Sequence, residues 1–289
     1  MFQRVAICGA AGQLGHELSR VFSSAGGELL RLGRAQLDLT NAPLVERTLA
    51  EFDPDLVINS AAYNMVDVAE QEPQAAYQVN ALAVRSLAIA CRQLDARLVH
   101  FSTDYVFDGT KGTTYVEEDA THPLGAYGVS KLAGEFYAQA YLDHPLIIRT
   151  SGVFGPRGLR TARGNFVELM LRLAASGQPI RVVEDHVASP TYAPALAERT
   201  LAMVQAGLSG VYHVGGGTPM SWYEYARMIF FEAGLAPELR ATNEREYRTA
   251  ARRPRYSALS NGKMERAGIP PMPPLPEAIR QYLAGRAEH

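Results

Sequence analysis

Short apolar runs alternate with segments of helical periodicity along the first half of the chain. The runs predict five strands, at residues 4–8, 29–32, 55–59, 97–101 and 146–149. Helical segments lie between them, through Leu18, Val21 and Phe22 and over 43–51, 74–93 and 126–142. The run at 55–59 is unbroken, as in a strand that is buried on both faces. This regular alternation predicts an α/β fold whose parallel sheet carries helices on both faces.

The pattern loosens after about residue 155. We expect strands at 180–183 and 211–214, and helices at 166–176, 193–205, 221–233 and 277–284. The composition does not change enough there to mark two independent domains. The chain therefore predicts a sheet domain over 1–155 and a smaller C-terminal α/β lobe over 156–289, some segments of which return to the sheet.

Composition narrows the class of protein. The chain has 289 residues, of which 47% are hydrophobic and 20% charged, and a net charge of −2. This balance gives no reason to expect a nucleic acid or a membrane as partner, and no apolar run reaches the ~18 residues of a membrane span. No signal peptide precedes the first strand, so we expect a cytoplasmic protein. We interpret Cys8 and Cys91 as buried small hydrophobes rather than as a disulfide or a nucleophile.

Three glycines, Gly9, Gly12 and Gly15, occupy the turn between the first strand and the helix that follows. Glycine allows a tight turn and a close approach of the backbone to a pyrophosphate, which then lies at the helix N-terminus. The alternative is a glycine-rich turn needed only for packing. The position favours a Rossmann-type, doubly wound sheet that binds a dinucleotide.

The end of the second strand bears on the choice of dinucleotide. An acidic residue there would bind the adenosine ribose hydroxyls and repel a 2′-phosphate. The chain instead has Gly33 and Arg34, and arginine matches phosphate geometry. We therefore predict NADPH rather than NADH, although Arg34 as a solvated surface residue is the alternative. Asp38 and Leu39 are expected to flank the adenine.

Tyr127 and Lys131 are four positions apart, one turn apart on the same face of the predicted helix. A neighbouring ammonium favours the phenolate and lowers the pKa of a tyrosine toward the working range. The pair can thus act as a proton donor, or it can be a chance surface pair. Ser102 and Thr103 leave the carboxyl end of the fourth strand, where ligands of parallel sheets bind, so the Thr103 hydroxyl is expected to hold a substrate carbonyl near Tyr127.

Several motifs, taken together, resemble a known family. GAAGQLG, NSAAYNMVDVAE, STDYVFDG, YGVSK and RTSGVFG occur in the order found in the extended short-chain dehydrogenase/reductases. The chain is most similar to the dTDP-4-dehydrorhamnose reductase family, with further matches in SPTY, HVGGG and RRPRYSALSN. The resemblance covers nearly the whole chain.

The resemblance implies roles for individual residues. It makes Thr103, Tyr127 and Lys131 catalytic, and it places Asn80 in the helix behind the site. Expected cofactor-binding residues are Gly9, Ala11, Gly12, Gln13, Leu14, Arg34, Asp38, Leu39, Ser60, Ala61, Ala62, Tyr63, Ser102, Tyr127 and Lys131. Expected substrate-binding residues are Val66, Thr103, Asp104, Tyr105, Gly152, Asn165 and Arg253.

The chain departs from the family at several positions. Where the family usually reads RTSWVYG, with the tryptophan expected against the sugar, this chain has Gly152. His186 replaces a glutamine and is interpreted as a packed or surface residue. The loop that follows Gly152 carries three arginines that either grip a diphosphate or are merely solvated: Arg157, Arg160 and Arg163.

A metal is not predicted. Some relatives bind Mg²⁺ between subunits through glutamates, and Glu17 occupies one such position. Pro194 and Ala195 stand where another glutamate would be sought. Glu17 is better explained as a first-turn helix residue that favours the helix dipole.

These features imply NADPH-dependent reduction of the 4-keto group of a nucleotide-linked 4-keto-6-deoxyhexose, with dTDP-4-dehydro-L-rhamnose as the first choice. A reductase of another 4-keto-deoxysugar is the main alternative, since Gly152 alters the sugar site. A non-catalytic NADP-binding regulatory subunit is disfavoured by the intact Thr103, Tyr127 and Lys131. An epimerase or dehydratase is disfavoured too, since the Asp-Glu pair of dehydratases is absent after Thr103. The expected partner is a nucleotide sugar, and a homodimer is the assembly considered.

Overall fold

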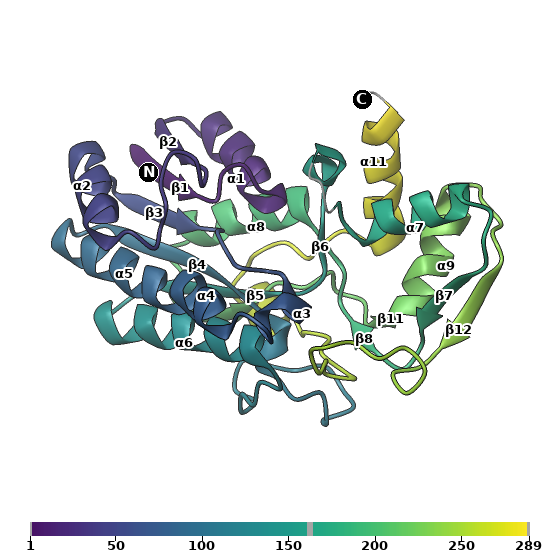
Figure 1. The fold of residues 1–289 in the computed structure, drawn as a ribbon. Helices are drawn as coiled ribbons and strands as arrows, with labels where there is room; N and C mark the ends of the chain where they lie inside the picture. Colours follow the sequence, from purple (N-terminus) through teal and green to yellow (C-terminus); the bar gives the residue numbers. More distant parts are fainter. Residues whose placement is uncertain (1, 161–163, 288–289) are drawn as a thin grey trace.

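A six-stranded parallel sheet forms the core of the larger part of the molecule, on the left in Figure 1. The structure is a computed structural model that describes residues 2–160 and 164–287. From edge to edge the six strands are β10 (Gly210–His213), β5 (Leu146–Thr150), β4 (Arg97–Thr103), β3 (Leu56–Asn59), β1 (Arg4–Cys8) and β2 (Glu28–Leu32). The chain passes from β1 to β2 on one side and then to β3 on the other. This reversal of strand order opens a crevice at the carboxyl ends of β1 and β3.

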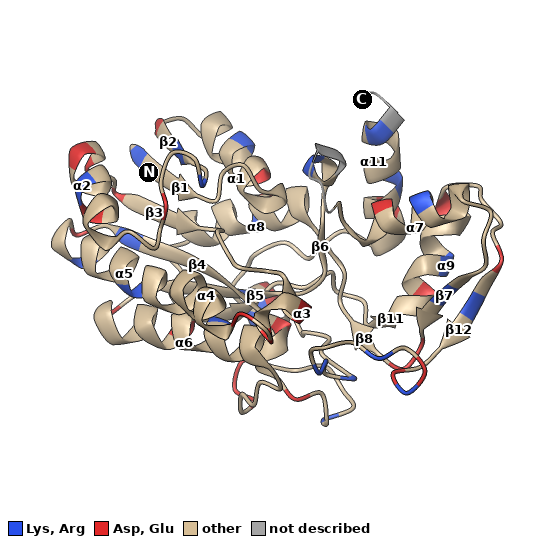
Figure 2. Cartoon of the chain, viewed as in Figure 1, with Lys and Arg blue, Asp and Glu red and all other residues tan. Residues whose placement is uncertain are grey.

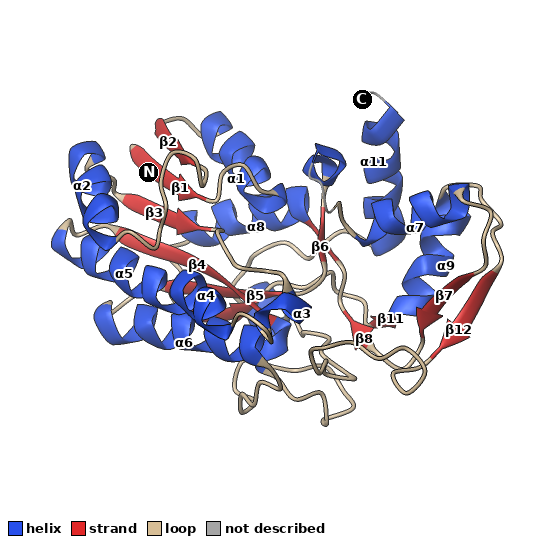
Figure 3. Ribbon diagram, in the orientation of Figure 1, coloured by secondary structure: helices blue, strands red, loops and turns tan. Residues whose placement is uncertain are grey.

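Helices cover both faces of the sheet, as the sequence predicted (Figure 3). They are α1 (Gln13–Ser24) and α8 (Ala193–Gln205) on one face, and α2 (Ala42–Phe52), α5 (Ala83–Gln93) and α6 (Ala126–Tyr141) on the other. Val5 and Ile7 of β1 pack toward α1, whereas the alternate residues Ala6 and Cys8 pack toward α2. Cys8 and Cys91 are both free and buried, as expected.

The helix predicted over 74–93 contains a π-helical turn. It begins as α4 (Pro73–Tyr77), widens over Gln78–Leu82 and continues as α5. Such turns insert one extra residue into a helix and often lie at functional sites. The apolar periodicity of the sequence does not reveal the inserted residue.

The π turn redirects Asn80 into a buried contact. Its side-chain oxygen accepts a hydrogen bond from the Tyr63 backbone N–H (2.8 Å), and its amide donates to the Ser130 hydroxyl (3.0 Å). Helix α6 meets this turn at Gly134, where an added Cβ would lie 2.2 Å from the Asn80 carbonyl oxygen. The absence of a side chain at Gly134 therefore lets α6 approach the π turn closely.

The remaining elements form a smaller C-terminal α/β region. Its strand pairs are β7 (Ile180–Val183) with β12 (Leu239–Thr242), β8 (Val187–Ala188) with β11 (Met220–Ser221), and β6 (Val153–Phe154) with β9 (Thr191–Tyr192). Its helices are α7 (Phe166–Ala175), α9 (Trp222–Glu232), α10 (Gly262–Arg266) and α11 (Leu275–Ala287), while α3 (Val66–Ala69) belongs to the first half of the chain. Four of these strands have two residues each, too few for a hydrophobic pattern to reveal.

Two later elements lie with the main sheet. Strand β10 pairs with β5, and α8 packs on α1, although both follow residue 155. Charges of both signs are spread over the two parts of the chain (Figure 2). Among the helices in the described part of the chain, none is both long and apolar enough to cross a membrane.

The close contact at Gly134 leads to a stability prediction. Gly134→Ala should lower the free energy of unfolding by about 1–3 kcal/mol, because the new methyl group overpacks the α6 contact with Asn80. Gly285→Ala is the matched control: it lies in α11 with open space around its Cβ position and should be neutral or slightly stabilising. Denaturant unfolding of both variants tests this, and equal midpoints would contradict it.

Candidate active site

A large pocket lies at the carboxyl ends of the strands and encloses about 2190 Å³. Its walls come from the sheet and from the C-terminal region. Every binding or catalytic residue predicted from the sequence lines it: Gly9, Ala11, Gly12, Gln13, Leu14, Arg34, Asp38, Leu39, Ser60, Ala61, Ala62, Tyr63, Val66, Ser102, Thr103, Asp104, Tyr105, Tyr127, Lys131, Gly152, Asn165 and Arg253. The fold thus brings these dispersed residues together, and what each one binds stays a prediction.

The glycine turn after β1 forms one end of the pocket. Gly9 has φ +79°, and a Cβ there would lie 2.6 Å from the backbone nitrogen of Ala61. A Cβ on Gly15 would lie 2.1 Å from the Gly9 carbonyl oxygen. Helix α1 begins at Gly12 without a side-chain cap. Its first N–H groups can therefore serve an anion, and the turn fits the pyrophosphate of a dinucleotide.

Arg34 is exposed beside this end of the pocket. The residue before it, Gly33, has no side chain. The Asp38 carboxylate accepts hydrogen bonds from the Thr40 N–H (3.0 Å) and hydroxyl (2.8 Å). These bonds, and to a lesser degree the Arg34 charge, lower the pKa of Asp38. A fixed carboxylate and a cation are thus available where an adenosine ribose would lie.

Hydrogen bonds to residues of β1 and β3 hold the loop that follows β3. The Ser60 hydroxyl donates to the Cys8 carbonyl (2.8 Å), and the Ala61 N–H donates to the Asn59 side chain (3.1 Å). Tyr63 is fixed by Asn80, as described above. These bonds make the loop a rigid wall of the pocket.

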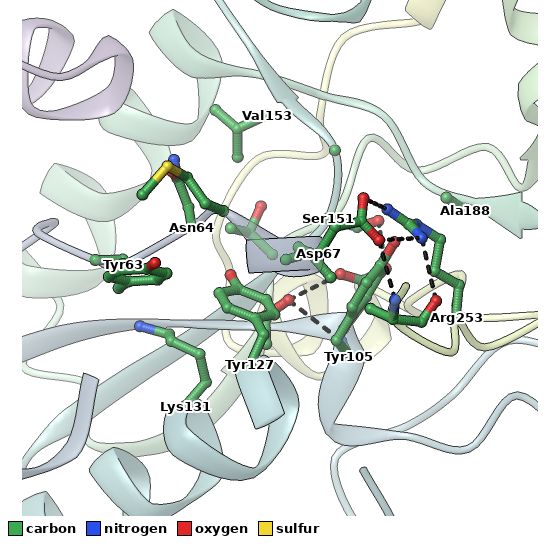
Figure 4. A pocket seen from close by; sticks show the side chains of 18 of the residues that line it. Tyr63, Asn64, Asp67, Tyr105, Tyr127, Lys131, Ser151, Val153, Ala188 and Arg253 are labelled. Atoms are coloured by element: carbon green, nitrogen blue, oxygen red, sulfur yellow. Dashed lines mark hydrogen bonds and ion pairs between the residues drawn. The ribbon is translucent and has the colours of Figure 1, made fainter. Parts of the chain in front are cut away.

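Tyr127 and Lys131 lie one turn apart on α6 at the middle of the pocket (Figure 4). The Lys131 ammonium is buried and donates to the Phe101 carbonyl (2.6 Å). Burial lowers the pKa of Lys131 to about 8, against the opposing charge of Glu135. The Tyr127 ring meets the Tyr105 ring edge-on, with 5.9 Å between centroids. The pair is part of the pocket and not a surface coincidence.

A buried ion pair behind Lys131 was not predicted. Glu135, one further turn along α6, receives bidentate hydrogen bonds from Arg149, the shortest of 2.7 Å, and a short bond from the Ser102 hydroxyl. All three side chains are buried. The regular spacing of positions 127, 131 and 135 on one helix face is the signal that would have indicated Glu135.

Asp104 lies behind Thr103 rather than free in the pocket. One carboxylate oxygen accepts from the Thr103 hydroxyl (3.1 Å), and the other accepts from Ser151 (2.8 Å) and Ser257 (2.5 Å). Burial raises the pKa of Asp104 to about 6, although these hydroxyls oppose the rise. Its carboxylate therefore orients Thr103 and joins β4 to the C-terminal region.

Two further predicted substrate residues also make contacts within the protein. Arg253 forms a bidentate ion pair with Asp67 of α3 (2.7 and 3.1 Å). The Asn165 side chain caps α7 by accepting from the Glu168 N–H (3.0 Å), and it donates to the Gln13 side chain (3.0 Å). Both residues link the two parts of the chain at the pocket.

Known proteins resemble this chain over nearly its whole length. The family model described as RmlD substrate binding domain matches residues 3–287. The chain belongs to this family. Spore coat polysaccharide biosynthesis protein SpsK of Bacillus subtilis is 39% identical over 284 residues, or 98% of each chain. The dTDP-4-dehydrorhamnose reductase of Aggregatibacter actinomycetemcomitans is 38% identical over 282 residues, or 93% of this chain and 94% of that one.

Among solved structures, dTDP-4-dehydrorhamnose reductase from Bacillus anthracis in complex with NADP superposes with a TM-score of 0.93 at 34% identity, covering 98% of this chain and 99% of that chain. The RmlD family and the fold class predicted from the sequence are thereby confirmed. The chain is a dTDP-4-dehydrorhamnose reductase-like, NAD(P)H-dependent oxidoreductase.

The departures from the family pattern fall in different places. Gly152 has φ +52°, and a Cβ there would lie 3.3 Å from the Trp222 ring. His186 is buried between Asp185 and Glu244, whose carboxylate oxygens lie 3.4 and 3.6 Å from its ring nitrogens, and burial lowers the pKa of His186. His186 also lines the pocket, so its interpretation as a packed residue stays a prediction.

The arginine loop contributes little to the described pocket. Arg157 is not one of the lining residues. Arg163 and the side chain of Arg160 lie outside the described residues. The alternative between a diphosphate grip and a solvated loop therefore stays open.

Glu17 is buried and receives a hydrogen bond from Arg20 (2.9 Å). The prediction that Glu17 lies in the first turn of its helix was wrong, because α1 begins at Gln13 and has no acidic residue in its first turn. The described residues contain no cluster of three or more potential metal ligands.

One wall of the pocket was missed altogether. It comes from the C-terminal region and includes Phe166, Leu169 and Leu173 of α7, Trp222 of α9, and Tyr247. Helix α7 looked like an ordinary amphipathic helix in the sequence. Which side of such a helix faces a pocket depends on tertiary packing, so the pattern alone could not reveal it.

The Glu135 contact predicts a change in pH dependence. Loss of the Lys131 proton should end the reaction as the pH rises through about 8. Glu135→Gln removes a negative charge that raises the Lys131 pKa, so the alkaline fall in kcat/KM should move to lower pH. The free energy of unfolding of this variant should also be about 3–5 kcal/mol lower than that of the parent, because Arg149 loses its charged partner.

The control is Glu238→Gln, which removes an exposed carboxylate paired with Arg240. Its pH–rate profile should match the parent. The profiles are compared at a temperature where circular dichroism shows each protein folded. An unchanged alkaline limb in Glu135→Gln would rule out this coupling.

Proposed function

We propose that the protein reduces the 4-keto group of a nucleotide-linked 4-keto-6-deoxyhexose with NADPH, with dTDP-4-dehydro-L-rhamnose converted to dTDP-L-rhamnose as the first choice. The observation that carries this proposal is the meeting of Thr103, Tyr127 and Lys131 in the pocket whose other end is the glycine turn. Residues 1–155 would mainly hold the cofactor and 156–289 mainly the sugar nucleotide. The same proposal includes a cytoplasmic location and a homodimer.

Each side chain has a chemical task that its surroundings support. The reduced nicotinamide supplies a hydride to the keto carbon. Tyr127 donates its phenolic proton to the oxygen on which negative charge develops. A positioned acid of this kind contributes typically ~10²–10⁴-fold to the rate. Thr103 donates its only hydroxyl proton to Asp104 in this structure, and it would turn this proton to the carbonyl oxygen when the substrate binds.

Lys131 stabilises the charge that Tyr127 acquires. Its ammonium is buried, so water screens its charge little and the interaction with the phenolate is stronger than it would be at the surface. Its bond to the Phe101 carbonyl fixes the ammonium relative to β4. The lowered pKa of Lys131 also leaves the residue close to its titration point near neutral pH.

Another nucleotide-linked 4-keto-deoxysugar is the second candidate substrate. Gly152 supports this alternative, because it leaves no side chain where the sugar is expected to rest. The 39% identity to SpsK, a protein named for spore coat polysaccharide biosynthesis, supports it as well. Both candidates use the same acid, the same ammonium and the same hydride chemistry.

The substrate proposal is tested with a panel of nucleotide 4-keto-6-deoxy sugars. NADPH oxidation should be fastest with dTDP-4-dehydro-L-rhamnose, and product identification should give dTDP-L-rhamnose. Tyr127→Phe should lower kcat by at least about 10²-fold while the Kd for NADPH stays within about twofold, because only the acid is lost. Retained turnover would remove Tyr127 from this role, and turnover of a different sugar only would favour the second candidate.

Cofactor choice is tested at Arg34. Arg34→Ala should weaken NADPH binding about tenfold or more and leave NADH binding almost unchanged, because only NADPH carries the 2′-phosphate. Arg31→Ala, an exposed arginine of β2, is the matched control. Equal losses for both cofactors, measured by equilibrium binding, would contradict a phosphate contact.

A further inference from the structure

A tryptophan fills the space beside Gly152. An added Cβ on Gly152 would lie 3.3 Å from the outer edge of the Trp222 ring and 3.4 Å from Pro190. The positive φ of Gly152 also disfavours any side chain there. The chain thus leaves position 152 empty and brings an aromatic ring from α9 against it.

Trp222 is held firmly in this position. The Trp222 backbone N–H donates a hydrogen bond to the His186 carbonyl (3.1 Å). The preceding residue, Ser221, caps α9 through reciprocal hydrogen bonds with Glu224. The ring packs on Phe166 with 4.7 Å between centroids, and Phe166 stacks on the buried Tyr225. One side of Trp222 therefore packs on other aromatic rings, while the half-buried residue still lines the pocket.

Short contacts connect this ring to the reacting end of the pocket. Thr103 bonds to Asp104 (3.1 Å), and Asp104 accepts from Ser151 (2.8 Å). Gly152 is the next residue, and Ser151 and Val153 on either side of it appear among the lining residues in Figure 4. A series of contacts through Asp104, Ser151 and Gly152 thus leads from Thr103 to the Trp222 ring in the wall of the same pocket.

We propose that Trp222 forms the surface on which the sugar ring rests, and that it determines which sugar is accepted. The proposal rests on the nucleotide-sugar reductase function proposed above. A 6-deoxyhexose carries a methyl group instead of a hydroxymethyl group, and its apolar edge suits an aromatic surface. Because Gly152 contributes no side chain, the position of the Trp222 ring sets the depth of the sugar site.

The sequence offers a direct measurement, since Trp222 is the only tryptophan in the chain. Tryptophan emission of the unaltered protein is followed without cofactor, while calorimetry measures binding in parallel. Saturating dTDP-L-rhamnose should change the intensity or the wavelength of the emission, since the sugar covers the ring. Free dTDP should bind and leave the emission nearly unchanged, because it has no sugar to cover Trp222.

A pair of variants on one helix tests the effect on turnover. Trp222→Leu should raise KM for the nucleotide sugar about tenfold and change kcat less than about threefold, because the lost contact is made in both ground and transition states. Its Kd for NADPH should not change. The control is Phe231→Leu, also in α9, whose side chain is 81% exposed and does not line the pocket. It should leave KM unchanged.

The outcomes separate this proposal from the proposed function. Calorimetric binding of dTDP-L-rhamnose without a change in emission, or an unchanged KM in Trp222→Leu, would overturn the role of Trp222 and leave the reductase function standing. Failure of all nucleotide sugars to bind would overturn both. If Trp222→Leu does not fold, Gly152→Ala, whose new methyl group crowds the ring, should shift the tryptophan emission and raise KM. An unchanged emission and KM in that variant would count against the role of Trp222.

Discussion

The arrangement of the active site depends on one buried cation. Lys131 keeps its ammonium in the interior with the Phe101 carbonyl as its hydrogen-bond acceptor, and burial of such a group is costly unless nearby charges favour it. Glu135 provides that charge, and Arg149 in turn balances Glu135. The ion pair crosses from α6 to β5, so the helix that carries Tyr127 is fixed to the sheet by the same interaction that supports the lysine.

Polar contacts around the pocket join the two parts of the chain. Asp104 binds Ser257, Arg253 binds Asp67, and Gln13 binds Asn165. Each contact pairs a residue near the sheet with one from beyond residue 155. Residues expected to touch the substrate therefore also set the distance between the pocket walls, and a mutation at one of them changes both binding and the relative position of the walls.

Much of this architecture could be read from the sequence because it depends on local patterns. The strands of the sheet contain short apolar runs, the glycine turn follows directly on the first of them, and Tyr127 and Lys131 share a helix face. The features that were missed depend on tertiary contacts. The π turn at Asn80 cannot be recognised from the hydrophobic periodicity. A strand of two residues is too short to show any periodicity. The partners that Asp104 and Asn165 have within the protein could not be read from the sequence either, and their contact with substrate stays a prediction.

Gly152 and Trp222 have a consequence for how this family can diverge. A bulky residue at position 152 needs a different backbone angle there and the space that the Trp222 ring occupies. On the role proposed for Trp222, a smaller residue at 222 would in turn leave the sugar without a wall while 152 remains glycine. The two positions are in contact, so the effects of changing them are not additive. On the role proposed for Trp222, a change of sugar preference by this route is expected to require matched substitutions at both positions.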